Sequence, residues 1–155
     1  MKKLITIEDY KNLKQQGIFA SKKIAFTNGC FDILHSGHVL YLEEAASLGD
    51  LLIIGLNSDS SVQRLKGSDR PINNERDRAI VLSGLSAIDY IIIFDDDTPL
   101  ELINTIIPDI LVKGGDWKIE DIVGADVVIN NGGMVKSLMF HENQSTTKII
   151  NKIKT

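Results

Sequence analysis

Short apolar runs that alternate with helical segments constrain the fold of this chain more than any other feature of its sequence. Each is short, rich in branched side chains and closed by glycine or polar residues, as is typical of buried strands. Four such runs read IAFTNG, LLIIGLN, YIIIF and DILVKGG, and they begin at residues 24, 51, 90 and 109. Strands of this kind occur in parallel sheets with helices on both faces. The pattern therefore predicts an α/β fold, a Rossmann-like doubly wound parallel sheet.

Helical segments fill the intervals between these strands. A leading helix is predicted from Thr6 to Gln16, because apolar residues recur at helical spacing and Thr6 with Asp9 forms a possible capping box. This helix stops at Gly17. Further helices are predicted over residues 37–46, 77–85 and 100–107, a short helix is predicted through Arg64 after a polar break at residues 57–59, and a terminal helix begins near Ser145.

Two more strand-like runs follow the fourth strand. DVVIN at 126–130 and MVKSLMF at 134–140 are short and apolar, and a turn signal of one asparagine and two glycines separates them. We therefore predict a strand for each run. The 155 residues suit one domain. We expect residues 1–155 to form a single compact domain, with the leading helix in 1–20, a Rossmann-like core with the C-terminal helix in 22–155, and no kinase domain.

Composition and charge exclude several classes of protein. The net charge of −4 disfavours non-specific attraction to nucleic acid or to anionic lipid. No apolar run approaches the roughly 20 residues that span a bilayer, and the first residues lack the apolar core of a signal peptide. A single cysteine permits no internal disulfide. We therefore expect a cytoplasmic protein with no nucleic-acid or membrane partner, and a local basic pocket for any anionic substrate.

Residues that can bind phosphate gather after the first strand, in the run from Asn28 to His38. Doubly wound sheets bind ligands at the carboxyl ends of their strands, and the N-terminus of a helix attracts anions. His35 and His38 are three residues apart and can face one phosphate, while Gly37 allows the backbone to approach it. The run therefore predicts a phosphate-binding loop.

Other interpretations of these residues are weaker. The histidines could be surface or capping residues, and a zinc site would need three or four ligands, whereas the only other histidine, His141, is far along the chain. Residues 95–97 are three aspartates, which we interpret as a solvated turn and not as a metal site. Cys30 has no base beside it in the sequence, so its sulfur is expected to pack.

The segment Gly29-Cys30-Phe31-Asp32 followed by His35-Ser36-Gly37-His38 resembles the HxGH nucleotidyltransferase superfamily, in its cytidylyltransferase-like branch. The resemblance continues through LNSDSSVQRLKGSDRPIN, ERDR, DDDTP, PDILVKGGDW and QSTTKII. Together these segments look like the D-glycero-β-D-manno-heptose 1-phosphate adenylyltransferases of ADP-heptose synthesis. Such enzymes transfer AMP from ATP to the sugar phosphate, which gives ADP-heptose and pyrophosphate. They are often fused to a sugar kinase, and we expect no kinase domain in this chain.

The resemblance also implies which residues act in the reaction. It implies a catalytic role for His35, His38 and Lys66. It implies nucleotide binding by loop and helix-start residues, namely Asn28, Gly29, Cys30, Phe31, Gly37, Arg78, Ser145, Thr146 and Thr147. It implies substrate binding by Asp32, Arg70, Lys113, Gly115 and Asp116. The structural alternatives are a solvated basic loop for the cations and plain helix capping for the three hydroxyl residues.

The implied partners are ATP, accompanied by Mg²⁺, and a sugar 1-phosphate, and relatives of this kind suggest a homodimer. The sugar phosphate oxygen is already anionic, so attack on the α-phosphorus needs no general base, and catalysis consists of positioning and charge stabilisation. Two alternatives remain: a cytidylyltransferase for glycerol 3-phosphate or a related alcohol phosphate, and a non-catalytic nucleotide-binding module. A Rossmann dehydrogenase is set aside because no GxGxxG follows the first strand.

Overall fold

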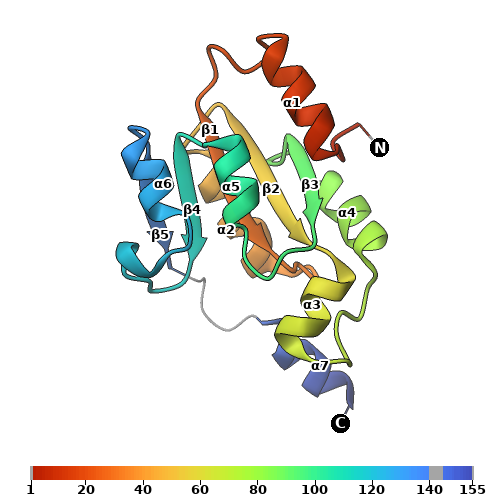
Figure 1. Cartoon of the computed structure of the whole chain (residues 1–155). Coiled ribbons are helices and arrows are strands. Elements are labelled where there is room, and N and C mark those ends of the chain that lie inside the picture. Colours follow the sequence, from red (N-terminus) through yellow and green to blue (C-terminus); the bar gives the residue numbers. More distant parts are fainter. Residues whose placement is uncertain (1, 140–144, 155) are drawn as a thin grey trace.

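The computed structural model describes residues 2–139 and 145–154 (Figure 1). Strands and helices alternate along most of the chain, as the apolar runs predicted. The elements in chain order are α1 (Ile7–Gln15), β1 (Ile24–Gly29), α2 (Ser36–Ala46), β2 (Leu51–Asn57), α3 (Asp59–Lys66), α4 (Glu75–Ser83), β3 (Tyr90–Phe94), α5 (Leu100–Ile106), β4 (Ile110–Gly114), the short 3₁₀ helix η1 (Ile119–Asp121), α6 (Ala125–Asn130), β5 (Met134–Leu138) and α7 (Thr146–Lys154). Among the described residues no helix is both long and apolar enough to cross a membrane.

The described strands form one five-stranded sheet in the order β3-β2-β1-β4-β5, and every pairing is parallel. From β1 the chain adds β2 and β3 on one side, and it then returns to add β4 and β5 on the other side. The order of strands therefore reverses between β1 and β4. This arrangement confirms the predicted doubly wound parallel sheet, and it places the expected ligand crevice between the carboxyl ends of these two strands.

Helices cover both faces of the sheet (Figure 1). One buried cluster packs residues of α1, α5 and α6 against the sheet, including Ile103 and Phe26, and the other packs α2 and α4, including Leu42. Gly55 lies in the middle of β2, where an added Cβ would come within 2.9 Å of the Phe26 ring and 3.1 Å of Leu102. Close packing of α5 on the sheet therefore requires glycine at this position.

The helix limits follow from local capping. The side chain of Thr6 accepts from the Asp9 N–H, and the Asp9 carboxylate accepts from the Thr6 N–H, so the predicted capping box is confirmed. The helix predicted over residues 77–85 begins earlier, at Glu75, because the Asn74 side chain accepts from the Asp77 N–H and forms the cap.

The prediction of a strand for DVVIN was wrong, because residues 125–130 form helix α6. Parallel neighbours need a crossover connection, and α6 supplies it between β4 and β5. Val128 is buried against the sheet while Ile129 is half exposed, so the apolar run serves one face of a short helix. The following run does form strand β5, and its last residue, Phe140, lies outside the described residues.

Three aspartates accept backbone hydrogen bonds at the amino end of the sheet. Each carboxylate accepts a hydrogen bond of 2.7 or 2.8 Å from a backbone N–H at the start of a strand. The pairs are Asp50 with Lys23, Asp109 with Ile24, and Asp89 with Leu52. Backbone donors that the sheet itself leaves unpaired are therefore satisfied at this end.

Candidate functional site

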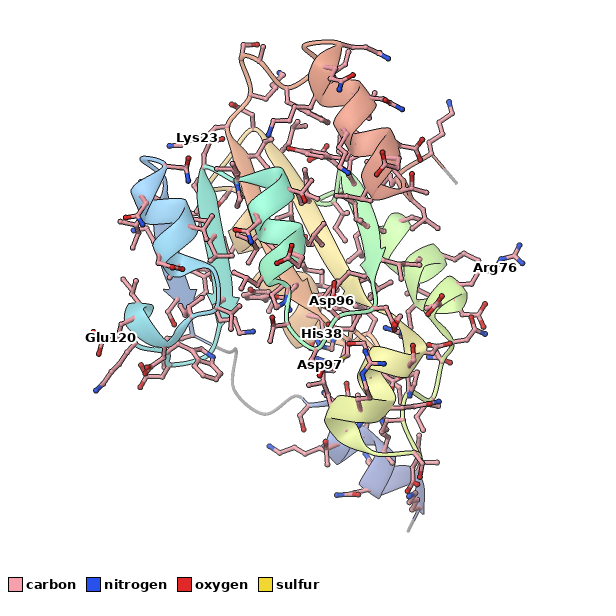
Figure 2. The ribbon with its side chains drawn as sticks, in the orientation of Figure 1. Lys23, His38, Arg76, Asp96, Asp97 and Glu120 are labelled. Carbon is pink, nitrogen blue, oxygen red and sulfur yellow. The ribbon has the colours of Figure 1, made fainter. Side chains whose placement is uncertain are left out.

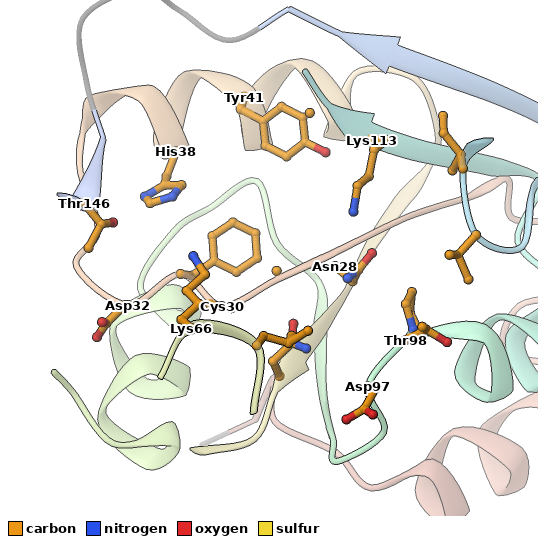
Figure 3. Close-up of a pocket in the computed structure, with 18 of the residues that line it drawn as sticks. Asn28, Cys30, Asp32, His38, Tyr41, Lys66, Asp97, Thr98, Lys113 and Thr146 are labelled. Atoms are coloured by element: carbon orange, nitrogen blue, oxygen red, sulfur yellow. The ribbon is translucent and has the colours of Figure 1, made fainter. Parts of the chain in front are cut away.

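A cavity of about 570 Å³ opens at the carboxyl ends of the strands, where the strand order reverses (Figure 3). Its walls come from the loop after β1, from the ends of α3 and β4, from the turn before α5 and from the start of α7. Ten of the predicted site residues line it: Asn28, Gly29, Cys30, Phe31, Asp32, His38, Lys66, Arg70, Lys113 and Thr146. The fold thus brings together residues that are far apart in the sequence.

The loop after β1 has an unusual backbone that shapes the cavity floor. Phe31 adopts a positive φ of 44°, a conformation that costs free energy for a residue with a side chain. Its ring packs on Gly29, where an added Cβ would come within 2.9 Å of it, and meets the His38 ring edge-on at 5.3 Å between centroids. The loop therefore places an aromatic ring beneath His38.

Helix α2 starts at the cavity without a side-chain cap. His35 is its N-cap residue and makes no capping hydrogen bond, and the first turn carries no acidic residue. In contrast, the N-termini of α1, α3 and α4 are each capped by a side chain, from Thr6, Ser58 and Asn74. The positive end of the α2 dipole, with no side-chain acceptor on its first N–H groups, therefore lies beside the cavity wall at His38, which favours an anion there.

The two histidines form a stacked pair. Their ring centroids lie 3.9 Å apart at an interplanar angle of 24°. Burial lowers the pKa of His35, and burial together with the charges of His35 and Lys66 lowers the pKa of His38 to about 4. Both Nδ1 atoms are buried without a hydrogen-bond partner. Only His38 lines the cavity, whereas His35 reaches it through the stacked ring.

Asp32 and Arg70 form a buried ion pair at the cavity wall. Arg70 Nε donates to Asp32 Oδ2 at 2.7 Å, and the Ile72 and Asn73 N–H groups donate to the same carboxylate at 2.9 Å. Although burial alone raises the pKa of Asp32, these hydrogen bonds and the Arg70 charge hold it below its usual value. Arg70 Nη2 remains buried and without a partner. Arg70 thus keeps one nitrogen that can donate to an anion, whereas the oxygens of Asp32 already accept hydrogen bonds within the protein.

Lys66 and Thr146 complete the same end of the cavity (Figure 3). Lys66 is the exposed last residue of α3, and Thr146 is the first residue of α7, where its hydroxyl donates to the Ile33 carbonyl at 3.3 Å. Ser145 caps α7 by accepting from the Lys148 N–H, and Thr147 is exposed. Of the three predicted hydroxyl residues, Thr146 alone lines the cavity.

The opposite end of the cavity is more apolar and carries one amine. Burial lowers the pKa of Lys113, whose Nζ lies 5.7 Å from the centroid of the Trp117 ring. Trp117 Nε1 donates to the Gly114 carbonyl at 3.0 Å, which fixes the indole beside the end of β4. Gly115, with a φ of 110°, and the exposed Asp116 lie in this turn but do not line the cavity.

Arg78 does not lie where a residue that contacts the triphosphate would be expected. It is 1% exposed and is not part of the cavity wall. Its guanidinium donates to three backbone carbonyls and to the carboxylate of Asp59. The predicted direct contact is corrected to a place in the protein interior beneath the cavity, because the donors of this side chain are used within the protein. Gly37, in the first turn of α2, also lies outside the wall.

Several wall residues were not predicted. They include apolar and aromatic side chains from the loop after β4, together with residues of other elements, namely Tyr41, Asn57, Leu65, Asp97, Thr98, Pro99, Leu111, Trp117, Ile122 and Val123. The KGGDW run pointed to the loop after β4, but no signal in the sequence marks the other apolar positions. Asp97 is exposed and paired with Arg64, which agrees with a solvated turn. Within the described residues no group of three or more His, Cys, Asp or Glu side chains could hold a metal ion.

The fold and the site together define a doubly wound α/β protein with a cavity at its strand-order reversal, beside the uncapped start of its first crossover helix. Comparison with known families agrees, since the cytidylyltransferase-like family model matches residues 26–152. The chain belongs to the cytidylyltransferase-like family.

Two curated relatives and one solved structure place the chain more closely. Bifunctional protein HldE of Campylobacter concisus is 57% identical over 153 residues, which are 98% of this chain and 31% of that protein. The protein of the same name from Wolinella succinogenes is 51% identical over 151 residues, 97% of this chain and 31% of its own length. This chain therefore spans less than a third of the length of these relatives. The crystal structure of the lipopolysaccharide core biosynthesis protein from Thermoplasma volcanium GSS1 superposes with a TM-score of 0.63 at 28% identity, over 80% of this chain and 100% of that one.

Proposed function

We propose that this protein transfers AMP from ATP to D-glycero-β-D-manno-heptose 1-phosphate, with release of pyrophosphate. The observation that supports a phosphate-transfer site is a group of buried side-chain nitrogens without hydrogen-bond partners. Within the described residues, the buried side-chain nitrogens that lack a partner are those of His35, His38 and Arg70. His38 and Arg70 line the cavity, and His35, the N-cap residue of α2, stacks on His38. Buried polar groups without partners are costly, so their grouping indicates a polar ligand at this place.

The reaction that we propose needs no base from the protein. An oxygen of the sugar phosphate attacks the α-phosphorus in line, the bond to the bridging oxygen breaks, and pyrophosphate leaves with that electron pair. His38, with His35 stacked on it, and the start of α2 would stabilise the charge on the α-phosphate. Lys66 and Arg70 would balance the charge of the phosphates, and Thr146 would hold the leaving pyrophosphate.

Magnesium enters this proposal as part of the nucleotide substrate. The described residues contain no cluster of acidic, histidine or cysteine side chains that could hold a metal ion. Mg²⁺ is commonly bound through the phosphates of its nucleotide together with water.

Similarity to the named relatives favours the heptose substrate. Identities of 57% and 51% over almost the whole chain link it to proteins named HldE, and the resemblance of KGGDW and DDDTP to the heptose enzymes points the same way. The alternative is a cytidylyltransferase for glycerol 3-phosphate, which would use the same donors for the phosphates. A non-catalytic nucleotide-binding module remains the second alternative. The proposal includes a cytoplasmic location and a homodimer. Light scattering of the purified chain would measure its oligomeric state.

The test is pyrophosphate release by the purified protein with ATP, CTP or GTP, Mg²⁺, and either heptose 1-phosphate or glycerol 3-phosphate. We expect turnover with ATP and the heptose, and its loss in His35→Ala and His38→Ala. Turnover only with CTP and glycerol 3-phosphate would replace the proposed substrates by the alternative pair. Binding of ATP without turnover on either acceptor would favour the non-catalytic module.

A further inference from the structure

Arg78 is a fully buried cation in α4 whose hydrogen bonds join separate parts of the chain. Its side chain is 0% exposed. Nε donates to the Asn73 carbonyl at 3.0 Å, and Nη1 donates to the carbonyls of Cys30 at 2.6 Å and Asn57 at 2.8 Å. Nη2 donates to the Asp59 carboxylate at 2.8 Å. Burying a guanidinium costs free energy, and here each of its nitrogens is used in a hydrogen bond. The role of its partners therefore indicates what the buried charge does.

The partners of Arg78 are the segments that carry the cavity wall. Cys30 belongs to the loop after β1 that leads to the histidine pair, and Asn57 is the last residue of β2; both line the cavity. Asn73 lies just beyond Arg70 and just before the cap of α4. One side chain thus connects the loop after β1, the end of β2 and the segment that carries Arg70.

A second buried link joins the same segments. The Asp32 carboxylate accepts from the N–H groups of Ile72 and Asn73, and the Asn73 side chain donates to the Asp32 carbonyl at 3.0 Å. Asp32 also holds Arg70 Nε. Residues 70–73 are therefore joined to residues 30–32 by two sets of hydrogen bonds. Asp32 makes one set, and Arg78 makes the other. After these bonds are made, Arg70 Nη2 is left buried and unpartnered.

We propose that Arg78 is a positioning residue that aims Arg70 at a phosphate of the substrates by holding the 70–73 segment against the loop after β1. Arg78 does not touch the substrates. Lysine could not replace it, because one ammonium group lacks the planar fork that reaches carbonyls on separate segments together with a carboxylate. The activity part of the test rests on the proposed function, whereas the measurement of loop motion does not.

The first experiment measures hydrogen–deuterium exchange in the wild type, Arg78→Lys and the matched control Arg76→Lys. Arg76 lies two residues away on α4 and points into solvent (Figure 2). We expect faster exchange in Arg78→Lys confined to peptides that contain residues 70–74, 29–33 and the end of β2 at Asn57, with the rest of β2 and with β4 unchanged. Faster exchange throughout the sheet, or none beyond the control, would overturn the proposal. Should Arg78→Lys fail to fold, Asp59→Asn removes only the charged partner and serves as the milder variant.

The second experiment is a double-mutant cycle between Arg78→Lys and Arg70→Met, read as kcat and KM for pyrophosphate release. We expect Arg78→Lys to lower kcat/KM about 10- to 100-fold, since small misplacement of a binding group can cost about 100-fold. In the Arg70→Met background the same change should cost less than about threefold, because its effect passes through Arg70. Additive losses would overturn the route through Arg70. Local exchange without any turnover in the wild type would leave the positioning role intact and reject the proposed function instead.

Discussion

The two ends of the sheet treat their polar groups in opposite ways. At the amino end, Asp50, Asp89 and Asp109 each accept a hydrogen bond from a backbone N–H at a strand start. At the carboxyl end, His38 and Arg70 keep buried nitrogens without partners, and α2 starts without a side-chain cap. The same sheet therefore has one end that is complete within the protein and one end that a ligand would complete.

On the proposed function, this difference separates the residues that stabilise the fold from those that would bind the ligand. A satisfied hydrogen bond at the amino end contributes to the free energy of unfolding, and its loss should not alter catalysis. An unpartnered donor at the carboxyl end costs stability in the free protein and returns that cost when a phosphate binds. Substitutions at the two ends should thus affect different measurements.

The largest expected effect is on catalysis, from a substitution at the carboxyl end of the sheet. We expect His38→Gln to lower kcat for pyrophosphate release by about 100- to 1,000-fold, as removal of one donor to a developing charge does elsewhere. Because His38 Nδ1 has no partner in the free protein, the midpoint of thermal unfolding should stay close to that of the wild type. A variant that unfolds much earlier and keeps its kcat would reverse the comparison. Steady-state kinetics and calorimetry of one preparation measure both quantities.

At the amino end of the sheet, the expected effect is on the free energy of unfolding. Asp89→Ala would leave the N–H of the fully buried Leu52 without its side-chain acceptor, and we expect a loss of about 1–3 kcal/mol in the free energy of unfolding. Urea titration measures the loss, with Glu120→Ala as the control, since that side chain points into solvent (Figure 2). The kcat of the folded variant should equal that of the wild type. A tenfold fall in kcat would show that the two ends are not independent.

The unfavourable burial of His38 predicts a pH dependence of stability. Its pKa is lowered from 6.5 to about 4 in the folded protein, so the unfolded chain binds more protons between these values. The stability contribution of the neutral ring is complete above pH 6.5 and is lost as the pH falls toward 4. After allowance for solvent screening, we expect wild type to lose about 1 kcal/mol more than His38→Gln over this range. Urea titrations at several pH values test this, and parallel curves would contradict it.

The smallest effect concerns the uncapped start of α2. Ser36→Asp adds an acidic residue to its first turn, where the helix dipole favours negative charge by about 0.3–1 kcal/mol. We therefore expect slightly higher thermal stability together with binding of Mg·ATP that is weaker by about two- to fivefold. Ser36→Asn is the neutral control. Tighter binding of Mg·ATP by Ser36→Asp, measured by calorimetric titration, would mean that no anion occupies this helix start.

Local patterns predicted much of the fold. The runs IAFTNG and LLIIGLN form β1 and β2 over the predicted residues, and the capping box between Thr6 and Asp9 starts α1. The prediction from the run DVVIN was wrong because five apolar-rich residues can form a buried strand or part of a short helix, and only the need for a crossover between β4 and β5 decides between them. Periodicity in so short a segment carries too little information.

Within the site, the sequence indicated the loop after β1, because its histidines and glycines follow a strand and begin a helix. It also pointed to Lys66, Arg70 and Thr146, which the fold brings to the same cavity. It did not separate Arg70, which keeps a free nitrogen, from Arg78, which is buried beneath the wall. The two arginines are only eight residues apart, and the direction of each side chain depends on acceptors contributed by other segments: the Asp32 carboxylate for Arg70, and the Cys30 and Asn57 carbonyls for Arg78.

The amino-acid sequence by itself determined that this chain alternates buried strands with helices and places two histidines and two glycines in the loop after the first strand, since both follow from local composition and spacing. Tertiary structure alone decided which donors remain free. Asp32 uses its oxygens on residues 70–73, and Arg78 uses its nitrogens on three backbone carbonyls and Asp59. Which donors and acceptors are paired is decided only when distant segments meet, because hydrogen bonds depend on distance in space and not on separation along the chain.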